Sequence, residues 1–229
     1  MFVGHYGVSF AAKRLRPEVP LWVLFVAVQL LDVFWAPLVL LGVERVRIVP
    51  GITASNPLDL YYMPYTHSLV AAALWALVAL LAWRMVVMGK RGAGKRGGGK
   101  PGVGGGAIVA AAVFSHWVLD LVVHRPDLPL YDNTAKVGLG LWDRPALAFG
   151  LEVALLVTGI ALYLRGGARR VAPWLILALV MLAVHAMAFF GAPPKSPAAA
   201  AVMALTAYIA LAAAAAWLER RRARDRAAA

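Results

Sequence analysis

Six apolar stretches, each close to 20 residues long, constrain the fold of this chain more than any other feature. They cover Leu21–Leu41, Thr66–Met88, Gly105–Val123, Pro145–Leu164, Ala172–Phe190 and Pro197–Trp217. A helix of about 20 apolar residues is what a hydrocarbon core of roughly 30 Å requires. The 229 residues are 62% hydrophobic and 15% charged, whereas a soluble domain carries about 25% charged residues. We therefore expect an all-α, polytopic membrane protein with about six transmembrane helices, in which residues 1–229 form a single integral membrane domain.

Basic residues gather in every second connection between these stretches. They precede the first stretch at Lys13, Arg14 and Arg16, and they recur in a Gly-rich loop at 89–106, at 165–170 and in the tail LERRRARDRAAA. Because Lys and Arg concentrate in cytoplasmic loops, this pattern places both termini in the cytoplasm. It predicts a multi-pass protein of the cell (inner) membrane. The same rule accounts for the net charge of +12, so nucleic acid is not an expected partner.

The first residues are mostly apolar but form too short a segment to cross a bilayer. The eleven residues before Lys13 would extend only about 18 Å as a helix. One interpretation is a half-helix that starts inside the membrane and reaches the cytoplasmic face at Lys13. The other is an interfacial amphipathic helix that lies on the membrane surface.

A few ionisable residues interrupt the apolar stretches, and such residues are costly in lipid unless they are paired or functional. His116, Asp120 and His124 are spaced i, i+4 and i+8, so they share one face of a helix. Asp32 and His116 each lie roughly 12–14 Å below the outer end of their stretch. On a half-helix His5 would reach a similar depth, and His67 would lie near the level of Asp120. The chain has no cysteine for a thiolate site, and imidazole with carboxylate favours zinc, with manganese or iron as alternatives.

Simpler interpretations exist for the same residues. Asp120 could do no more than accept a hydrogen bond from His116 or from a neighbouring helix. His67 could belong to the start of the second stretch, where Thr66 or Ser68 would cap the helix.

The remaining ionisable residues have simple interpretations of their own. His124, which precedes Arg125, is expected to be an interfacial anchor. Glu152 is expected near the outer start of its stretch, paired with Arg125 or Arg144. His185 has no acidic neighbour in sequence and is expected to pack or to form an interhelical hydrogen bond.

Four short motifs follow one another in the first part of the chain: GHYGVSFAAK at 4–13, LLD at 30–32, YTHSLVAA at 65–72 and FSHWVLD at 114–120, followed by PDLPL. Their order resembles that of the membrane-bound metal-dependent hydrolases, also described as LexA-binding, inner-membrane-associated hydrolases. That family typically has an early GH before a helix, then LPDxDH, HRGxTHS and SHxxxD elements. The resemblance separates a motif-bearing part, residues 1–130, from carboxy-terminal helices and a basic tail, residues 131–229.

The resemblance implies which residues bind the metal. The positions that match are His5, Asp32, His67, His116 and Asp120. The chain also departs from the family, because Phe34 and Trp35 replace an aspartate and a histidine, and Tyr62, Met63 and Pro64 replace the HRG sequence. Ligands of a two-metal site are therefore missing, and the five matching residues suit one divalent metal with a water molecule.

These residues predict a metal-dependent hydrolase. A metal with an open coordination position would activate a water molecule and polarise an ester or phosphoryl oxygen. Asp120 would be a fifth ligand, a general base that holds the water, or the group that orients His116. Arg125 is a predicted catalytic residue. Together with Lys136 it could hold an anionic headgroup just outside the metal site. The depth of the site predicts a lipid or lipid-linked (phospho)ester as substrate, with membrane lipids as partners.

Two other classes of function stay open. A transporter or channel would use the polar residues as an ion or proton path, which requires polar residues to continue toward the cytoplasmic side. A noncatalytic membrane subunit of a larger complex would use the helices for docking. The Ala-rich last stretch could pack closely against another helix, within the chain or between chains.

Overall fold

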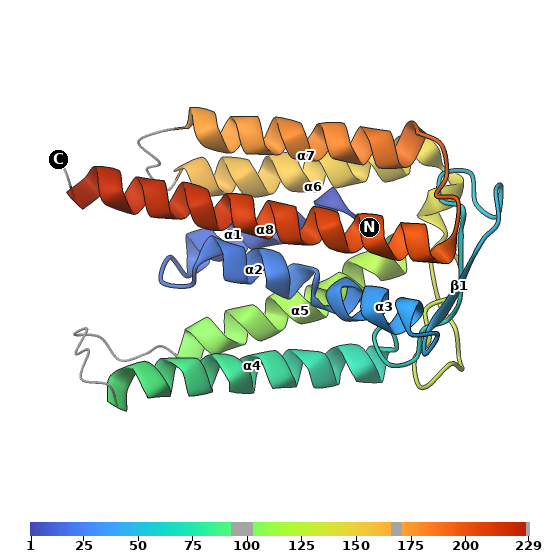
Figure 1. Cartoon of the computed structure of the whole chain (residues 1–229), viewed down its shortest axis with the longest axis horizontal. Helices are drawn as coiled ribbons and strands as arrows, with labels where there is room; N and C mark the ends of the chain where they lie inside the picture. Colours follow the sequence, from blue (N-terminus) through green and yellow to red (C-terminus); the bar gives the residue numbers. More distant parts are fainter. Residues whose placement is uncertain (93–102, 166–170, 228–229) are drawn as a thin grey trace.

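The computed structural model describes residues 1–92, 103–165 and 171–227. Its helices run along the long axis of the molecule, as in a membrane bundle (Figure 1). The elements are α1 (Val3–Leu15), α2 (Leu21–Val28), α3 (Leu30–Leu40), β1 (Arg45–Ile48), β2 (Leu58–Tyr62), α4 (Leu69–Gly92), α5 (Val103–Val123), a 3-10 turn (Leu141–Asp143), α6 (Pro145–Arg165), α7 (Ala172–Phe190) and α8 (Pro197–Ala227). The all-α expectation is confirmed, with one small antiparallel hairpin, β1–β2, that the sequence did not lead us to expect.

Within the described residues, the helices α4 to α8 are each long and apolar enough to cross a membrane. The first predicted span, Leu21–Leu41, is not one continuous helix. It breaks at Gln29 into α2 and α3, which meet at an angle of 54° and are together long and apolar enough for a sixth span. Non-helical backbone at membrane depth is tolerated where it is buried in protein, and Gln29 is fully buried.

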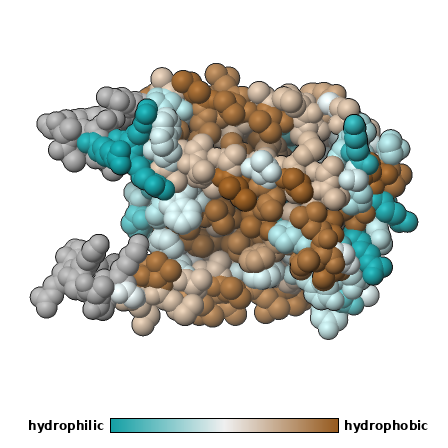
Figure 2. Space-filling view, viewed as in Figure 1, coloured by the Kyte–Doolittle hydropathy of each residue, from teal (hydrophilic) through white to brown (hydrophobic). Residues whose placement is uncertain are grey.

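The surface has the pattern expected of a multi-pass membrane protein. Hydrophobic residues cover most of the visible face between two ends where hydrophilic residues gather (Figure 2). Large apolar side chains such as Leu74 and Leu81 on α4, Leu179 on α7 and Met203 on α8 are exposed. Exposed side chains of this kind are satisfied by lipid, so the helices form a bundle whose outer faces suit a bilayer.

The two ends of the molecule differ in character. One end carries the β1–β2 hairpin and the connection between α5 and α6, and we call it the hairpin end (Figure 1). The other end carries the last turn of α1, with Lys13 and Arg14, and the carboxy-terminal part of α8; we call it the basic end. The Gly-rich loop is shorter than the predicted range 89–106, because α4 extends to Gly92 and α5 starts at Val103. Its remainder, and the predicted basic positions 166–170, lie outside the described residues.

Helix α1 lies in the interior of the bundle. Residues on all sides of it are buried, so the interpretation as a surface helix is wrong, and the half-helix is the interpretation that agrees with this burial. Two glycines let its backbone touch that of α6: a Cβ added at Gly7 would lie 2.2 Å from the Leu155 carbonyl oxygen, and one at Gly159 would lie 2.1 Å from the Gly7 oxygen. Small residues allow such close approach of helices in membranes. This contact carries His5 into the centre of the protein.

Candidate metal centre

The structure brings the five predicted metal residues together from four separate segments. His5 comes from α1, Asp32 from α3, His67 from the segment just before α4, and His116 and Asp120 from α5. All are buried except Asp32, whose side chain is 16% exposed. The break at Gln29 and the interior position of α1 are what allow these short segments to meet in one place.

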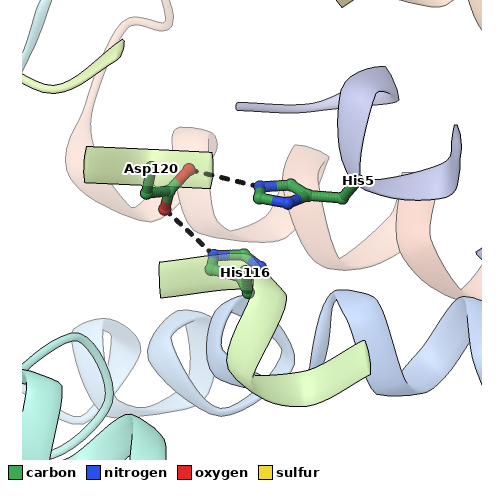
Figure 3. Close-up of side chains that lie close together, drawn as sticks. All are labelled: His5, His116 and Asp120. Carbon is green, nitrogen blue, oxygen red and sulfur yellow. Dashed lines mark ion pairs between the residues drawn. The ribbon is translucent and has the colours of Figure 1, made fainter. Parts of the chain in front are cut away.

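Asp120 occupies the middle of the cluster. Its Oδ1 lies 3.2 Å from His5 Nε2, and its Oδ2 lies 3.1 Å from His116 Nε2 (Figure 3). His67 Nε2 lies 3.3 Å from Asp32 Oδ1 and 3.9 Å from Asp120 Oδ2. The amino group of Met1 lies 2.5 Å from Asp120 Oδ1. The carboxylate thus faces imidazole nitrogens from three segments.

The helix break determines which nitrogen of His116 is free. The Val28 carbonyl, at the end of α2, accepts a hydrogen bond of 2.7 Å from His116 Nδ1. A carbonyl can only accept, so Nδ1 carries a proton and directs Nε2 into the cluster. Metal-binding histidines commonly have their second nitrogen held in this way.

Two histidines of the cluster have nitrogens that lack a hydrogen-bond partner among the described residues. His116 Nε2 and both nitrogens of His5 are buried without a hydrogen-bond partner, although Nε2 of each lies close to an oxygen of Asp120. The two rings stack in parallel with their centroids 4.0 Å apart. Buried polar atoms in native proteins are rarely left unpaired. Adjacent ligands of one cation lie close without hydrogen bonding to each other, and this is the geometry observed.

The separations between these atoms suit a bound metal. Two ligands at about 2.0–2.1 Å from a tetrahedral zinc lie about 3.3 Å apart, and the shortest contacts here are 3.1, 3.2 and 3.3 Å. Two groups of three could hold an ion: His5 with His116 and Asp120, and Asp32 with His67 and His116. Because both groups need His116 Nε2, and one nitrogen binds one ion, they compete for it. The donor set therefore fits one divalent metal better than two.

His124 is not an interfacial anchor, contrary to the expectation from sequence. It is buried, with Nδ1 2.8 Å from Asp127 Oδ1 and Nε2 3.5 Å from Asp120 Oδ2. Its ring also packs against Trp142, with centroids 4.3 Å apart. The turn after α5 folds Asp127 back toward the helix, which the motif spacing alone does not reveal.

Arg125 and Lys136 lie at the hairpin end and have protein partners there. Arg125 Nε donates to Asp127 Oδ2 at 3.2 Å, and its guanidinium also pairs with Asp59. Lys136 Nζ donates to the Tyr61 carbonyl at 2.7 Å, and partial burial lowers the pKa of this ammonium. Among the described residues, the contacts of Arg125 connect it to Asp120 through Asp127 and His124.

Glu152 was expected to pair with Arg125 or Arg144, but its partners are different. Its Oε2 accepts hydrogen bonds from the backbone N–H groups of Phe2, at 2.7 Å, and Gly4, at 3.2 Å. A carboxylate at a helix N-terminus satisfies unpaired N–H groups and interacts favourably with the helix dipole. Glu152 therefore anchors the start of α1, which carries His5. His185, expected to pack, stacks on the Phe149 ring of α6, with centroids 4.8 Å apart.

Near the cluster, Tyr208 was assigned no role from the sequence, whereas Ser68 was one of two predicted caps for the second stretch. Tyr208, in α8, donates a hydrogen bond of 2.7 Å from its hydroxyl to Asp32 Oδ2. Ser68 caps α4, since its Oγ accepts the Ala71 N–H at 3.1 Å. This leaves His67 one residue before the cap, so the capping interpretation holds for Ser68 while the ring of His67 faces the cluster.

Comparisons of the chain with protein-family models, with curated proteins and with solved structures give no match.

Proposed function

We propose that this protein is a membrane-embedded, metal-dependent hydrolase acting on a lipid or lipid-linked (phospho)ester. The observation that carries the proposal is the buried cluster of imidazoles and carboxylates from four segments, with unsatisfied nitrogens facing carboxylate oxygens. Ionisable groups at membrane depth are costly and usually functional. A divalent cation would add positive charge between Asp32 and Asp120, where the Met1 ammonium already contacts Asp120.

The residues that would hold the ion are His116 together with His5 and Asp120, or with Asp32 and His67. Zinc is the first choice for mixed imidazole and carboxylate ligands, with manganese or iron as alternatives. When bound, such an ion supplies a Lewis acid that activates water and polarises a phosphoryl or ester oxygen.

Asp120 has two tasks in this proposal. One carboxylate oxygen contacts His5 and the other contacts His116, so Asp120 orients both rings. A carboxylate in this position can also accept a proton from a water molecule within hydrogen-bond reach. Arg125 stays a predicted catalytic residue; to hold a headgroup it would have to exchange one of its contacts with Asp59 and Asp127 for the substrate.

The distribution of buried polar groups supports hydrolysis over transport. Polar side chains continue from the cluster toward the hairpin end through Thr66, Glu44, His124 and Asp127. In the described part of α1, the buried polar side chain beyond His5 on the way to the basic end is that of Ser9, whose hydroxyl donates to the Leu24 carbonyl. An ion path would need polar groups on both sides, so the polar residues along α1 favour a site connected to the hairpin end over a path through the membrane.

Hydrolysis by purified protein in lipid nanodiscs tests the proposal. The substrates would be a panel of phospholipids and polyprenyl phosphates, and release of the water-soluble product would be measured. We expect His116→Ala to lower turnover about a hundredfold or more, as loss of metal-site residues commonly does. The matched control is Gly150→Ala, because a Cβ there meets no atom within 4 Å. Equal turnover by wild type and His116→Ala on every substrate would refute the proposal and leave the noncatalytic subunit as the better interpretation.

A further inference from the structure

We infer that Glu44 is a positioning residue of the metal centre, which sets the orientation and tautomer of His67 through the hydroxyl of Thr66. The effect on metal binding rests on the proposed function, whereas the effect on the His67 ring does not. From the sequence, Glu44 counted only as one charge in a connection of balanced charge. In the structure it lies between α3 and β1 and is almost completely buried.

Three hydrogen bonds hold the carboxylate of Glu44 against the segment that carries His67. Oε1 accepts the backbone N–H groups of Tyr65, at 2.8 Å, and Thr66, at 2.9 Å. Oε2 accepts the Thr66 hydroxyl at 2.7 Å. A buried carboxylate with this many donors is fixed in place, and it fixes the Tyr65–Thr66 backbone in return.

The single proton of the Thr66 hydroxyl then determines which nitrogen of the His67 ring is protonated. Thr66 Oγ1 lies 2.7 Å from His67 Nδ1 as well as 2.7 Å from Glu44 Oε2. A hydroxyl has one proton, and Thr66 gives it to the carboxylate, so the contact with His67 requires Nδ1–H to donate. In the neutral ring His67 Nε2 is then left with its lone pair, and it lies 3.3 Å from Asp32 Oδ1.

This arrangement parallels the one at His116. There a backbone carbonyl, that of Val28, takes the Nδ1 proton and leaves Nε2 free. At His67 the same result needs a carboxylate behind a hydroxyl, because an unassisted hydroxyl could donate to Nδ1 and reverse the tautomer. Glu44 removes that possibility. Partners of this kind typically change metal affinity 10–100-fold when they are lost.

Burial raises the pKa of Glu44 above its usual value, although the hydrogen bonds from Thr66 and Tyr65 act in the opposite direction. Replacing the carboxylate by an amide should therefore be tolerated by the fold. The amide cannot reproduce the contacts, because its NH₂ group would face either the two backbone N–H groups or the Thr66 oxygen. In the second case Thr66 would donate to His67 Nδ1, and the ring would present N–H to Asp32.

Four variants test the inference: Thr66→Val, Thr66→Ser, Glu44→Gln and the control Glu18→Gln, which removes an exposed carboxylate. The probe is Zn²⁺ itself, titrated into metal-free protein against a chromophoric chelator. We expect Thr66→Val and Glu44→Gln to weaken Zn²⁺ binding 10–100-fold. Thr66→Ser, which keeps the hydroxyl, should bind within about threefold of wild type, as should Glu18→Gln. Weak binding by Thr66→Ser would mean that the methyl group and packing matter, and would overturn the inference.

A second readout uses metal-free protein and separates this inference from the proposed function. The chain has five histidines, so ¹⁵N spectra of histidine-labelled protein can be assigned, with His67→Ala identifying one ring. We expect the Nδ1 of His67 to carry the proton in wild type and Thr66→Ser, and to lose this preference in Thr66→Val and Glu44→Gln. Unchanged His67 signals in those two variants would overturn the inference. If wild-type protein binds no Zn²⁺, the metal centre fails, and these spectra alone decide the role of Glu44.

Discussion

At the scale of single residues, one hydrogen bond often decides what a side chain in this centre can do. His116 and His67 each give their Nδ1 proton to an oxygen and keep Nε2 free. His5 lacks such a partner and is held by its ring stacking on His116 and by its position on α1. Asp32 is held differently, by the hydroxyl of Tyr208. The ligand atoms are thus prepared by groups that would not touch the metal.

Tyr208→Phe is predicted to weaken Zn²⁺ binding roughly tenfold without unfolding the protein. The change removes only the hydroxyl that orients Asp32, and a hydrogen bond to a charged group contributes about 1.5 kcal/mol. Competition with a chelator measures the effect. Tyr131→Phe, at an exposed tyrosine, is the control, and identical affinities for both variants would count against a role for Tyr208.

At the scale of elements, the contact between α1 and α6 places the half-helix inside the bundle. Gly7 and Gly159 bring the two backbones together, and Glu152 on α6 accepts the N–H groups at the start of α1. A helix of 13 residues gains little stability alone, so these contacts hold His5 in place. The position of one proposed ligand therefore depends on helix packing.

Gly159→Ala is predicted to destabilise the protein by at least about 1–3 kcal/mol, the usual cost of overpacking a core. The new methyl group would meet the backbone of Gly7, which cannot move away without displacing α1. Thermal unfolding in detergent measures the change as a lower midpoint. Gly150→Ala on the same helix meets no neighbouring atom and should unfold like wild type. A Gly159→Ala midpoint equal to that of Gly150→Ala would show that the close contact is unimportant.

Periodicity and length predicted the elements that depend on local sequence. Apolar length located the spans, and α7 has the predicted bounds, Ala172–Phe190. Helical spacing placed His116, Asp120 and His124 on one face of α5, and Asp120 does contact both histidines. These features follow from neighbours within a few turns of one helix, so they can be read without knowledge of the tertiary structure.

Features that depend on distant contacts could not be predicted. The break at Gln29 has no proline or glycine beside it. The Val28 carbonyl at the break accepts from His116, and the Gln29 side-chain amide donates to the Phe2 carbonyl; both partners lie far away in the sequence. The contact of Tyr208 with Asp32 joins α8 to α3, across 176 residues. The role of Glu152 depends on its contact with α1, and no residue spacing within α6 indicates that contact.

At the scale of the whole molecule, the centre is connected to one end by polar groups. A series of contacts runs from Asp120 through His124 and Asp127 to Arg125 and then to Asp59 on the hairpin. Hydrophobic residues cover most of the visible face between the two ends (Figure 2). This layout suits a site that exchanges water and product at the hairpin end while its substrate resides in the bilayer.

The topology predicted from charge places the hairpin end outside the cell and the basic end in the cytoplasm. Because the chain has no cysteine, single reporters can be introduced without a background. We expect a membrane-impermeant maleimide to label Tyr131→Cys in intact cells, and to label Glu18→Cys only after the membrane is opened. Both positions are exposed. The reverse pattern of labelling would invert the orientation.

Elemental analysis of the purified protein, before and after chelation, tests the central claim most directly. His5 Nε2 and His116 Nε2 lie 3.2 Å and 3.1 Å from the two oxygens of Asp120, a spacing that suits ligands of a shared cation. We predict about one divalent ion per chain in wild type, removed by a strong chelator and restored by added zinc. His116→Ala, which takes a shared nitrogen from both possible groups, should carry almost none. Wild-type protein with no more metal than this variant would contradict the account.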